Sequence, residues 1–442
     1  MRTVLSPYLR TAALVATATS TAAVATAATT ATATAQDRDR PLDAGFEEVY
    51  RVGGVAAPDW AQFTRPGTVA FDGSGNLFVL DILAAEIVVI GTGGQLVRTI
   101  GGPGEGPGEF RSAGDMVVWR DGRVAVADMG HGAYQLFDPA GDLERMVSIG
   151  GDDNPLLAMT TLRTAIRGAP DGGSLFAQGM PNVLGGLGAA MAEMMGMEME
   201  EPDRVDDRGI EQLNLSGEVV AAETVLQAWS PPSEPAPEVS ASDLMNVSAM
   251  MRTAFGQLTH YEPRLLWDLL PDGTIAYSDS SAYAVRLLAP DGSVRAVLTR
   301  PLRPERVTPR IRAATIEQRI EDFQGEAGSV PEEARGLMDL MGGDVMREGI
   351  ENAPFFDEIP VITRIRATWA GNLWIQRRGE EPWSDSGPID VFGADGRYVG
   401  TFAEGLTEMP NAFGPDGRVA FVELDEFDVP TIVVRTVPAE VR

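Results

Sequence analysis

The chain has 442 residues and a formal net charge of −29, with 64 acidic residues, 35 basic residues and no cysteine. This acidity argues against nucleic acid and anionic membrane surfaces as partners, because both require a basic surface. The lack of cysteine excludes disulfides, thiolate metal sites and cysteine nucleophiles.

Residues 1–35 predict a secretory signal peptide. Arg2 and Arg10 give a basic start, a run rich in Ala, Thr and Val follows, and the small residues 33–35 favour cleavage before Gln36. No other stretch approaches the ~20 apolar residues that a membrane-spanning helix needs. We therefore expect no membrane insertion and a mature chain, 36–442, that is a periplasmic or extracellular monomer.

A repeated pattern of short strands and glycine-containing turns begins at residue 67. Its clearest copy predicts the strands Thr68–Phe71, Asn76–Leu80, Ile87–Ile90 and Leu96–Ile100. Glycine permits the positive φ angles of tight turns, so this copy is predicted to form a four-stranded antiparallel meander. A second clean copy covers 113–149. Asp81 and Asp128 end the second strands of these copies, one blade length apart.

Four further copies complete the repeat. They cover 160–226, with an interruption, and then 263–299, 361–402 and 408–436. The last copy is one strand short, and we expect the upstream segment Phe46–Val52 to supply its outer strand, which would leave no open sheet edge. The sequence thus predicts an all-β fold, a six-bladed β-propeller that forms a single domain over 36–442.

The unit GSGNLFVLD, followed by VRTIGGPGEGPGEF, resembles the NHL-type six-bladed propellers of bacterial exported proteins. Gly106–Phe110 is similar to a connection between blades in that group. The resemblance implies a propeller with a binding role. It implies no reaction, because a fold does not determine function.

Three segments interrupt the repeat. Residues 180–209 are rich in Gly, Met and acids, 230–256 begin with a Pro-rich stretch before a predicted helix over Asp243–Phe255, and 309–352 have helical apolar spacing. Long connections in a compact domain tend to be functional or disordered. We expect the helical ones to lie over one face as a partial lid.

The chain offers little for catalysis. Only His131 and His260 could act as histidine bases, and no Gly-x-Ser-x-Gly motif is present. We interpret the aspartates that end second strands, Asp81, Asp128 and Asp279, as turn caps. A divalent cation such as Ca²⁺ would suit carboxylate ligands in the channel, but no matching ligand set is visible, so we predict no cofactor.

Arginines gather where the inner strands are predicted to begin. Alignment of the copies places several at or near the position just before the inner strand, and these starts meet at one mouth of the channel. Guanidinium groups bind carboxylate or phosphate through two parallel hydrogen bonds. The predicted ligand-binding residues are Arg65, Arg111, Arg163, Arg264, Arg364, His260 and Tyr261.

Two readings of the arginines stay open. They either form an anion site or pair with local acids such as Glu109, Glu262 and Glu408. The favoured function is a non-enzymatic binding or scaffold protein of the cell envelope that holds a small anionic ligand, peptide or protein at one mouth. The alternative is a metal-dependent hydrolase or lyase, as in gluconolactonase-like and lyase propellers, and metal analysis would distinguish the two.

Overall fold

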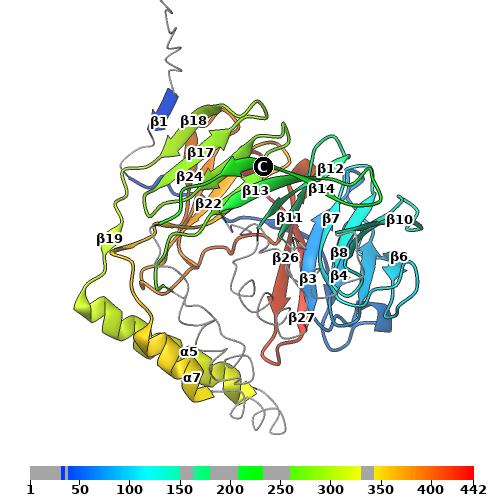
Figure 1. Ribbon diagram of the computed structural model, residues 1–442, viewed down its shortest axis with the longest axis horizontal. Helices are drawn as coiled ribbons and strands as arrows, with labels where there is room; N and C mark the ends of the chain where they lie inside the picture. Colours follow the sequence, from blue (N-terminus) through cyan, green and yellow to red (C-terminus); the bar gives the residue numbers. More distant parts are fainter. Residues whose placement is uncertain are drawn as a thin grey trace, which may run out of the picture.

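The computed structural model describes residues 31–34, 38–149, 163, 165–179, 208–231, 259–329 and 343–442. Within them, six antiparallel sheets of four strands are arranged in a ring, which confirms the predicted six-bladed propeller (Figure 1). Inner strands of neighbouring blades contact one another around a central channel.

Blades 1 to 3 come from the first half of the chain. From the channel outward, blade 1 consists of β3 (Pro66–Phe71), β4 (Leu77–Asp81), β5 (Glu86–Ile90) and β6 (Leu96–Gly101). Blade 2 consists of β7 (Ala113–Val118), β8 (Val124–Asp128), β9 (Ala133–Phe137) and β10 (Leu143–Ser148). Blade 3 consists of β11 (Ile166–Gly168), β12 (Ser174–Gln178), β13 (Gly209–Asn214) and β14 (Ala221–Gln227).

Blades 4 to 6 follow the same order. Blade 4 consists of β15 (Leu266–Leu269), β16 (Ile275–Ser278), β17 (Ala284–Leu288) and β18 (Val294–Thr299). Blade 5 consists of β21 (Ile362–Ala367), β22 (Leu373–Arg377), β23 (Ile389–Phe392) and β24 (Tyr398–Phe402). Blade 6 consists of β25 (Ala412–Phe413), β26 (Arg418–Leu424), β27 (Pro430–Thr436) and β2 (Glu47–Gly53).

The N-terminal strand β2 closes the ring. It pairs antiparallel with β27 as the outer strand of blade 6, which confirms the role predicted for Phe46–Val52. Figure 1 shows the red strands β26 and β27 beside the blue strand β3, so the last blade adjoins the first. Short 3₁₀ helices in the described residues cover Asp59–Ala61, Pro415–Gly417 and Ala439–Val441.

Aspartate and glycine shape the turns between first and second strands. In blade 1, Asp72 Oδ1 accepts hydrogen bonds from the backbone N–H groups of Ser74 and Asn76, at 2.9 and 2.8 Å. Gly75 completes the turn at a φ of +82°, which a side chain would disfavour. The inner strands end at these turns, and we call this side of the disc the turn face. The opposite side, where the inner strands begin, is the entry face.

Of the aspartates that end the second strands, Asp81 and Asp128 cap their turns as predicted, whereas the contacts of Asp279 are with other segments. Asp81 accepts the backbone N–H groups of its own turn and those of 64 and 65, which lead into β3. Asp128 does the same for its turn and for the segment before β7. Asp279 accepts the N–H of Trp229 and forms an ion pair with Arg286.

Apolar side chains between blades make the core. Phe110, from the predicted connection at Gly106–Phe110, is buried between blades 1 and 2 and packs edge-on against Phe137, with ring centroids 5.8 Å apart. Gly101 ends β6 at a φ of +82°, and a Cβ there would lie 2.3 Å from the Phe110 ring. Only glycine therefore fits where the chain leaves blade 1.

A helical insertion leaves the entry face between blades 4 and 5. The ribbon β19 (Glu305–Arg306) and β20 (Glu358–Ile359) carries α5 (Pro309–Ser329) and α7 (Gly343–Asn352). The two helices pack together at one side of the ring (Figure 1), which confirms helices within 309–352.

The other insertions are mostly outside the described residues. Of the Met-rich segment 180–209 only Arg208 and Gly209 are described, and the helix predicted at Asp243–Phe255 is not. The partial lid therefore stays a prediction. Within the predicted signal peptide, β1 (Ala31–Thr34) pairs parallel with β18. No helix in the described part of the chain is long and apolar enough to cross a membrane.

Candidate functional site

The central channel widens into a cavity of about 880 Å³. Its wall is made by the inner strands of blades 1 to 5, by residues 411–413 at β25, and by turns that follow the inner strands. The lining of blades 1 to 3 includes nearly the whole of each inner strand, whereas that of blades 4 and 5 is confined to the last residues of the strand and the following turn, so the cavity opens toward the turn face. Its volume lies within the range of pockets that hold small molecules.

Every blade contributes a polar side chain to the cavity wall. In blade order these are Thr68, Asp115, Arg167, Asp268, Arg366 and Asn411. Polar groups that leave water must find partners or lose free energy. The partners of these six residues therefore show which of them is available to a ligand.

Asp115 is fully engaged by the protein. Its carboxylate accepts hydrogen bonds from the Thr68 hydroxyl, from its neighbour Met116 N–H at 2.9 Å and from Ile166 N–H at 3.1 Å. It thus links the inner strands of blades 1, 2 and 3. Burial raises the pKa of Asp115, although the Thr68 hydrogen bond and the charge of Arg167 oppose that shift.

Asp268 is engaged in the same way two blades further on. Its Oδ1 accepts hydrogen bonds from Arg167 Nε at 2.8 Å and Leu269 N–H at 3.0 Å, and its Oδ2 accepts one from Ala367 N–H at 2.8 Å. The Arg167 guanidinium also lies over the Trp267 ring, 5.6 Å from its centroid. Arg167 and Asp268 therefore satisfy each other and link blades 3, 4 and 5.

Arg366 is different, because it has no hydrogen-bond or ion-pair partner among the described residues. The alternation of β21 places Arg364 and Arg366 on the face opposite the core residue Ile365. Burial, followed by the like charge of Arg167, lowers the pKa of Arg366 to about 10. The side chain is still a cation at neutral pH, so the cavity wall carries a partly dehydrated positive charge.

Asn411 offers a second donor on the neighbouring blade. It is exposed, and its Oδ1 accepts a hydrogen bond from Val422 N–H at 2.9 Å. Its side-chain nitrogen donates to no residue in the described part of the chain. Arg366 in blade 5 and Asn411 in blade 6 thus present donors on adjacent walls of one cavity, an arrangement suited to a carboxylate.

A stacked pair lies across the cavity at the turn face. The Arg120 guanidinium sits over the Trp369 ring, 4.7 Å from its centroid, and its Nη2 is 3.5 Å from the Trp369 carbonyl oxygen. Arg120 belongs to blade 2 and Trp369 to blade 5, which are opposite each other in a six-bladed ring. The contact therefore spans the mouth and narrows access from the turn face.

The predicted arginines lie on the entry side and do not line this cavity. Arg65 and Arg111 lie one position apart when the blades are aligned: both donate a backbone N–H to the aspartate that ends the second strand, but Arg65 corresponds to Ser112 and Arg111 to Thr64. The Arg65 side chain is exposed, whereas Arg111 lies 3.6 Å from Glu105. Arg163 is buried and binds Glu211 at 2.9 Å.

The remaining predicted residues divide into two groups. Arg264 and Arg364 are exposed, and Arg364 lies close enough to contribute to the lowered pKa of Arg366. His260 and Tyr261 are buried beneath the helical insertion, where His260 stacks on Phe355 at 4.3 Å between ring centroids and the Tyr261 hydroxyl bonds to α5. Convergence of the five arginines on one ligand stays a prediction.

His131 links the end of β8 to the connection between blades 1 and 2. Its Nδ1 lies 2.7 Å from Asp128 Oδ2, its Nε2 lies 3.3 Å from the Glu105 carbonyl oxygen, and its side chain is 11% exposed. Burial opposes ionisation of Asp128, but hydrogen bonds from His131 and from nearby backbone N–H groups lower its pKa. The sequence analysis considered His131 only as a possible base and did not predict this contact.

Among the residues that the structure describes, no group of three or more His, Asp or Glu side chains is arranged to hold a metal ion. The polar residues of the cavity were also missed by the sequence analysis. A signal for them exists, because a charged residue interrupts an otherwise apolar run at Arg167 and Asp268, and Arg366 is the second arginine of its inner strand.

Comparison with known proteins assigns no family to the chain. No protein-family model and no curated protein matches the chain. Solved structures do match. A Bacteroides fragilis protein whose name marks it as exported is 10% identical, with a TM-score of 0.47, and the match covers 92% of this chain and 99% of that one.

Two enzymes also match at low similarity. Virginiamycin B lyase from Staphylococcus aureus is 11% identical, with a TM-score of 0.38, over 88% of this chain and 99% of that one. A gluconolactonase from Xanthomonas campestris is 11% identical, with a TM-score of 0.40, over 85% of this chain and 87% of that one. Similarity at this level assigns neither activity to the present chain.

Proposed function

We propose that the protein is an exported binding propeller that holds a small carboxylate in its central cavity, with Arg366 as the main anchor. The observation that carries this proposal is the guanidinium of Arg366, which faces a cavity of about 880 Å³ without a partner among the described residues. A buried cation gains most from a ligand that supplies the missing charge.

The neighbouring groups favour a carboxylate. The Arg366 guanidinium can donate two parallel hydrogen bonds to the two carboxylate oxygens, and the Asn411 amide can donate a third from the next blade. Trp369 and Arg120 at the mouth suit a flat or aromatic group attached to that carboxylate. The expected ligand is therefore a small organic acid or the free C-terminus of a peptide.

The alternative of a channel-bound catalytic metal is less well supported by the same residues. Asp115 and Asp268 are the acidic side chains deepest in the wall, and each already accepts three hydrogen bonds from the protein. Binding a divalent cation would require them to break these bonds. Membership of the NHL-type propellers and a periplasmic location belong to this proposal as well, as expectations from the sequence.

Matched pairs of acids and amides test the proposal. We would measure the melting temperature (Tm) and calorimetric binding with benzoate against benzamide, succinate against succinamide, and an acetylated dipeptide acid against its amide. The acids should bind and the amides should not. Trp369→Phe in parallel would show whether the aromatic mouth contributes.

Two variants locate the site. Arg366→Gln should abolish the response to the acids, whereas Arg295→Gln should retain it, because Arg295 lies outside the cavity and pairs with Asp272 on the turn face. The proposal fails if no acid binds, or if Arg366→Gln binds the acids as tightly as the unmodified protein. Metal analysis of the same samples, with and without chelator, addresses the enzymatic alternative.

A further inference from the structure

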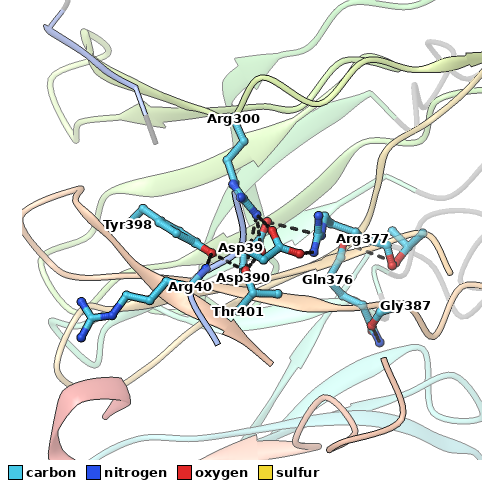
Figure 2. A network of polar contacts seen from close by, with 10 residues as sticks. Asp39, Arg40, Arg300, Gln376, Arg377, Gly387, Asp390, Tyr398 and Thr401 are labelled. Atoms are coloured by element: carbon cyan, nitrogen blue, oxygen red, sulfur yellow. Dashed lines mark hydrogen bonds and ion pairs between the residues drawn. The ribbon is translucent and has the colours of Figure 1, made fainter. Parts of the chain in front are cut away.

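A second arginine cluster lies away from the cavity, at the junction of blades 4 and 5 (Figure 2). Arg300 follows β18, Arg377 ends β22, and Asp390 lies in the middle of β23. The side chains of Arg300 and Asp390 are completely buried, and 11% of the Arg377 side chain is exposed. These three residues alone would place two positive charges and one negative charge in the protein interior.

Asp39 supplies the missing negative charge. One of its carboxylate oxygens lies 2.7 Å from Arg300 Nη1 and the other lies 2.8 Å from Arg377 Nη2, as Figure 2 shows. Arg300 Nη1 also lies 2.8 Å from Asp390 Oδ1. The second Asp390 oxygen is 3.5 Å from Arg377 Nε, close enough for an ion pair but poorly aligned for a hydrogen bond.

The pocket around the arginines is built by the blades, and Asp39 comes from outside them. The Arg300 guanidinium lies over the Tyr398 ring, 4.4 Å from its centroid, and the Thr401 hydroxyl donates to Asp390 at 2.5 Å. Asp39, by contrast, belongs to the N-terminal segment before β2, and 46% of its side chain is exposed. A carboxylate can therefore reach the two arginines from solvent.

The backbone around Asp39 is held by the outer strand of blade 5. Thr401 donates its N–H to the Arg40 carbonyl at 2.7 Å and accepts the Leu42 N–H at 2.9 Å. Leu42 is buried against Gly400, where an added Cβ would come within 2.7 Å of its side chain. The segment 38–42 therefore lies on blade 5 like a bound extended peptide, before β2 continues into blade 6.

We infer that Arg300 and Arg377 form a carboxylate-binding pocket that the N-terminal segment fills with Asp39, so that residues 38–42 act as an intramolecular ligand. This ionic latch fastens the N-terminal segment to blades 4 and 5 before β2 completes blade 6. A chain without cysteine cannot fasten its N-terminal segment with a disulfide; the latch holds this segment in place, while the pairing of β2 with β27 closes the ring. It also sets a limit on N-terminal trimming, because a mature chain that begins after Asp39 would lose it.

Chemical rescue of a full-length variant tests the pocket. Asp39→Ala should lower the Tm by about 5 °C, because it removes one of the two carboxylates that pair with Arg300 and Arg377 among the described residues. Acetate or formate should then occupy the vacated space and recover about 2 °C at saturation, while chloride at the same ionic strength should not. All measurements use an Arg366→Gln background, so that binding in the central cavity makes no contribution.

The matched control is Asp43→Ala, an exposed acid directly after the segment 38–42. It should leave the Tm unchanged and gain nothing from acetate. Adding Arg377→Gln to Asp39→Ala should remove the acetate response. If Asp39→Ala does not fold, Asp39→Asn keeps the shape and removes only the charge, and it should still lower the Tm. The inference is wrong if the Asp39 variants melt like Asp43→Ala, or if acetate stabilises all variants equally.

Discussion

The protein contains two clusters built from the same residues, two arginines and two aspartates, and they behave differently. At the junction of blades 4 and 5, both carboxylates face the guanidinium groups of Arg300 and Arg377 (Figure 2). In the cavity, Asp115 and Asp268 each accept three hydrogen bonds, two of which come from backbone N–H groups. Arg167 therefore finds a partner, and Arg366 finds none among the described residues.

The difference shows that formal neutrality does not decide whether a buried charge is available. Both clusters have balanced charges, yet among the described residues only the junction cluster pairs both of its arginines with carboxylates of the protein. We call it the closed cluster, and we call Arg167, Arg366, Asp115 and Asp268 of the cavity the open cluster. The carboxylates of the cavity link inner strands across blades, and this structural role leaves Arg366 open to a ligand. The two clusters thus predict opposite consequences for stability and for binding.

The largest effect on stability is expected when the buried carboxylate of Asp390 is removed from the closed cluster. Asp390→Ala should lower the free energy of unfolding by about 3–5 kcal/mol, because it leaves buried guanidinium groups undercompensated. Urea denaturation gives this value, with Asp395→Ala as the control, since Asp395 is an exposed partner of Arg397. A loss below about 1 kcal/mol for Asp390→Ala would show that the junction cluster is not a stabilising unit.

The open cluster should respond in the opposite sense. Arg366→Leu removes a charge that has no partner among the described residues, so we expect unchanged or slightly higher stability. Carboxylate affinity should fall about 10- to 100-fold, the effect of losing charged hydrogen bonds. Calorimetry and thermal melts on one sample measure both quantities. A strong loss of stability would mean that Arg366 is structural, like Arg300.

The sequence predicts the fold well, because its signals are local. Alternating strands and Asp-Gly turns repeat within each blade, and the missing strand of the last blade identifies Glu47–Gly53 as its completion. The caps at Asp81 and Asp128 follow from the same local logic, since each carboxylate bonds the turn that follows it. These features require no knowledge of how blades meet.

The cavity and its open arginine could not be predicted in this way. Arg167 meets Asp268 across 101 residues and Arg377 meets Asp39 across 338, so local alignment does not show which arginine keeps a partner. One usable signal was present. Arg167, Asp268 and Arg366 each stand two residues before the first residue of their turn, at 169, 270 and 368. Alignment on the turns would have found these three of the six cavity residues.

The two clusters should also differ in their pH dependence. Burial opposes ionisation of Asp39, but hydrogen bonds from Arg377 and Arg300 lower its pKa below the ordinary 3.8. Its contribution to stability is therefore present above about pH 4 and is lost as the pH falls through the lowered pKa. The difference in Tm between the unmodified protein and Asp39→Asn should shrink on acidification.

Asp115 should show the reverse trend. Burial raises its pKa, so its ionisation disfavours the folded state, and this cost disappears as the pH falls through the raised pKa. The Tm of the unmodified protein should therefore rise relative to the Tm of Asp115→Asn as the pH falls. Melting curves between about pH 3 and pH 7 for both variants test the contrast. Parallel trends would contradict the assignment of one closed and one open cluster.

The smallest effect concerns access to the open cluster. Arg120→Ala removes the cation–π contact across the mouth, worth about 0.5–1 kcal/mol at an exposed site. It leaves Arg366 and Asn411 in place, so the affinity for the carboxylate should change less than about threefold, while association becomes faster. Stopped-flow fluorescence measures the rate, and Arg123→Ala is the control, because Arg123 pairs with Asp121 and stacks on Trp119 within its own blade. Equal association rates for the two variants would show that ligands do not enter past Trp369. The route to the cavity would then be the entry face, with its exposed arginines.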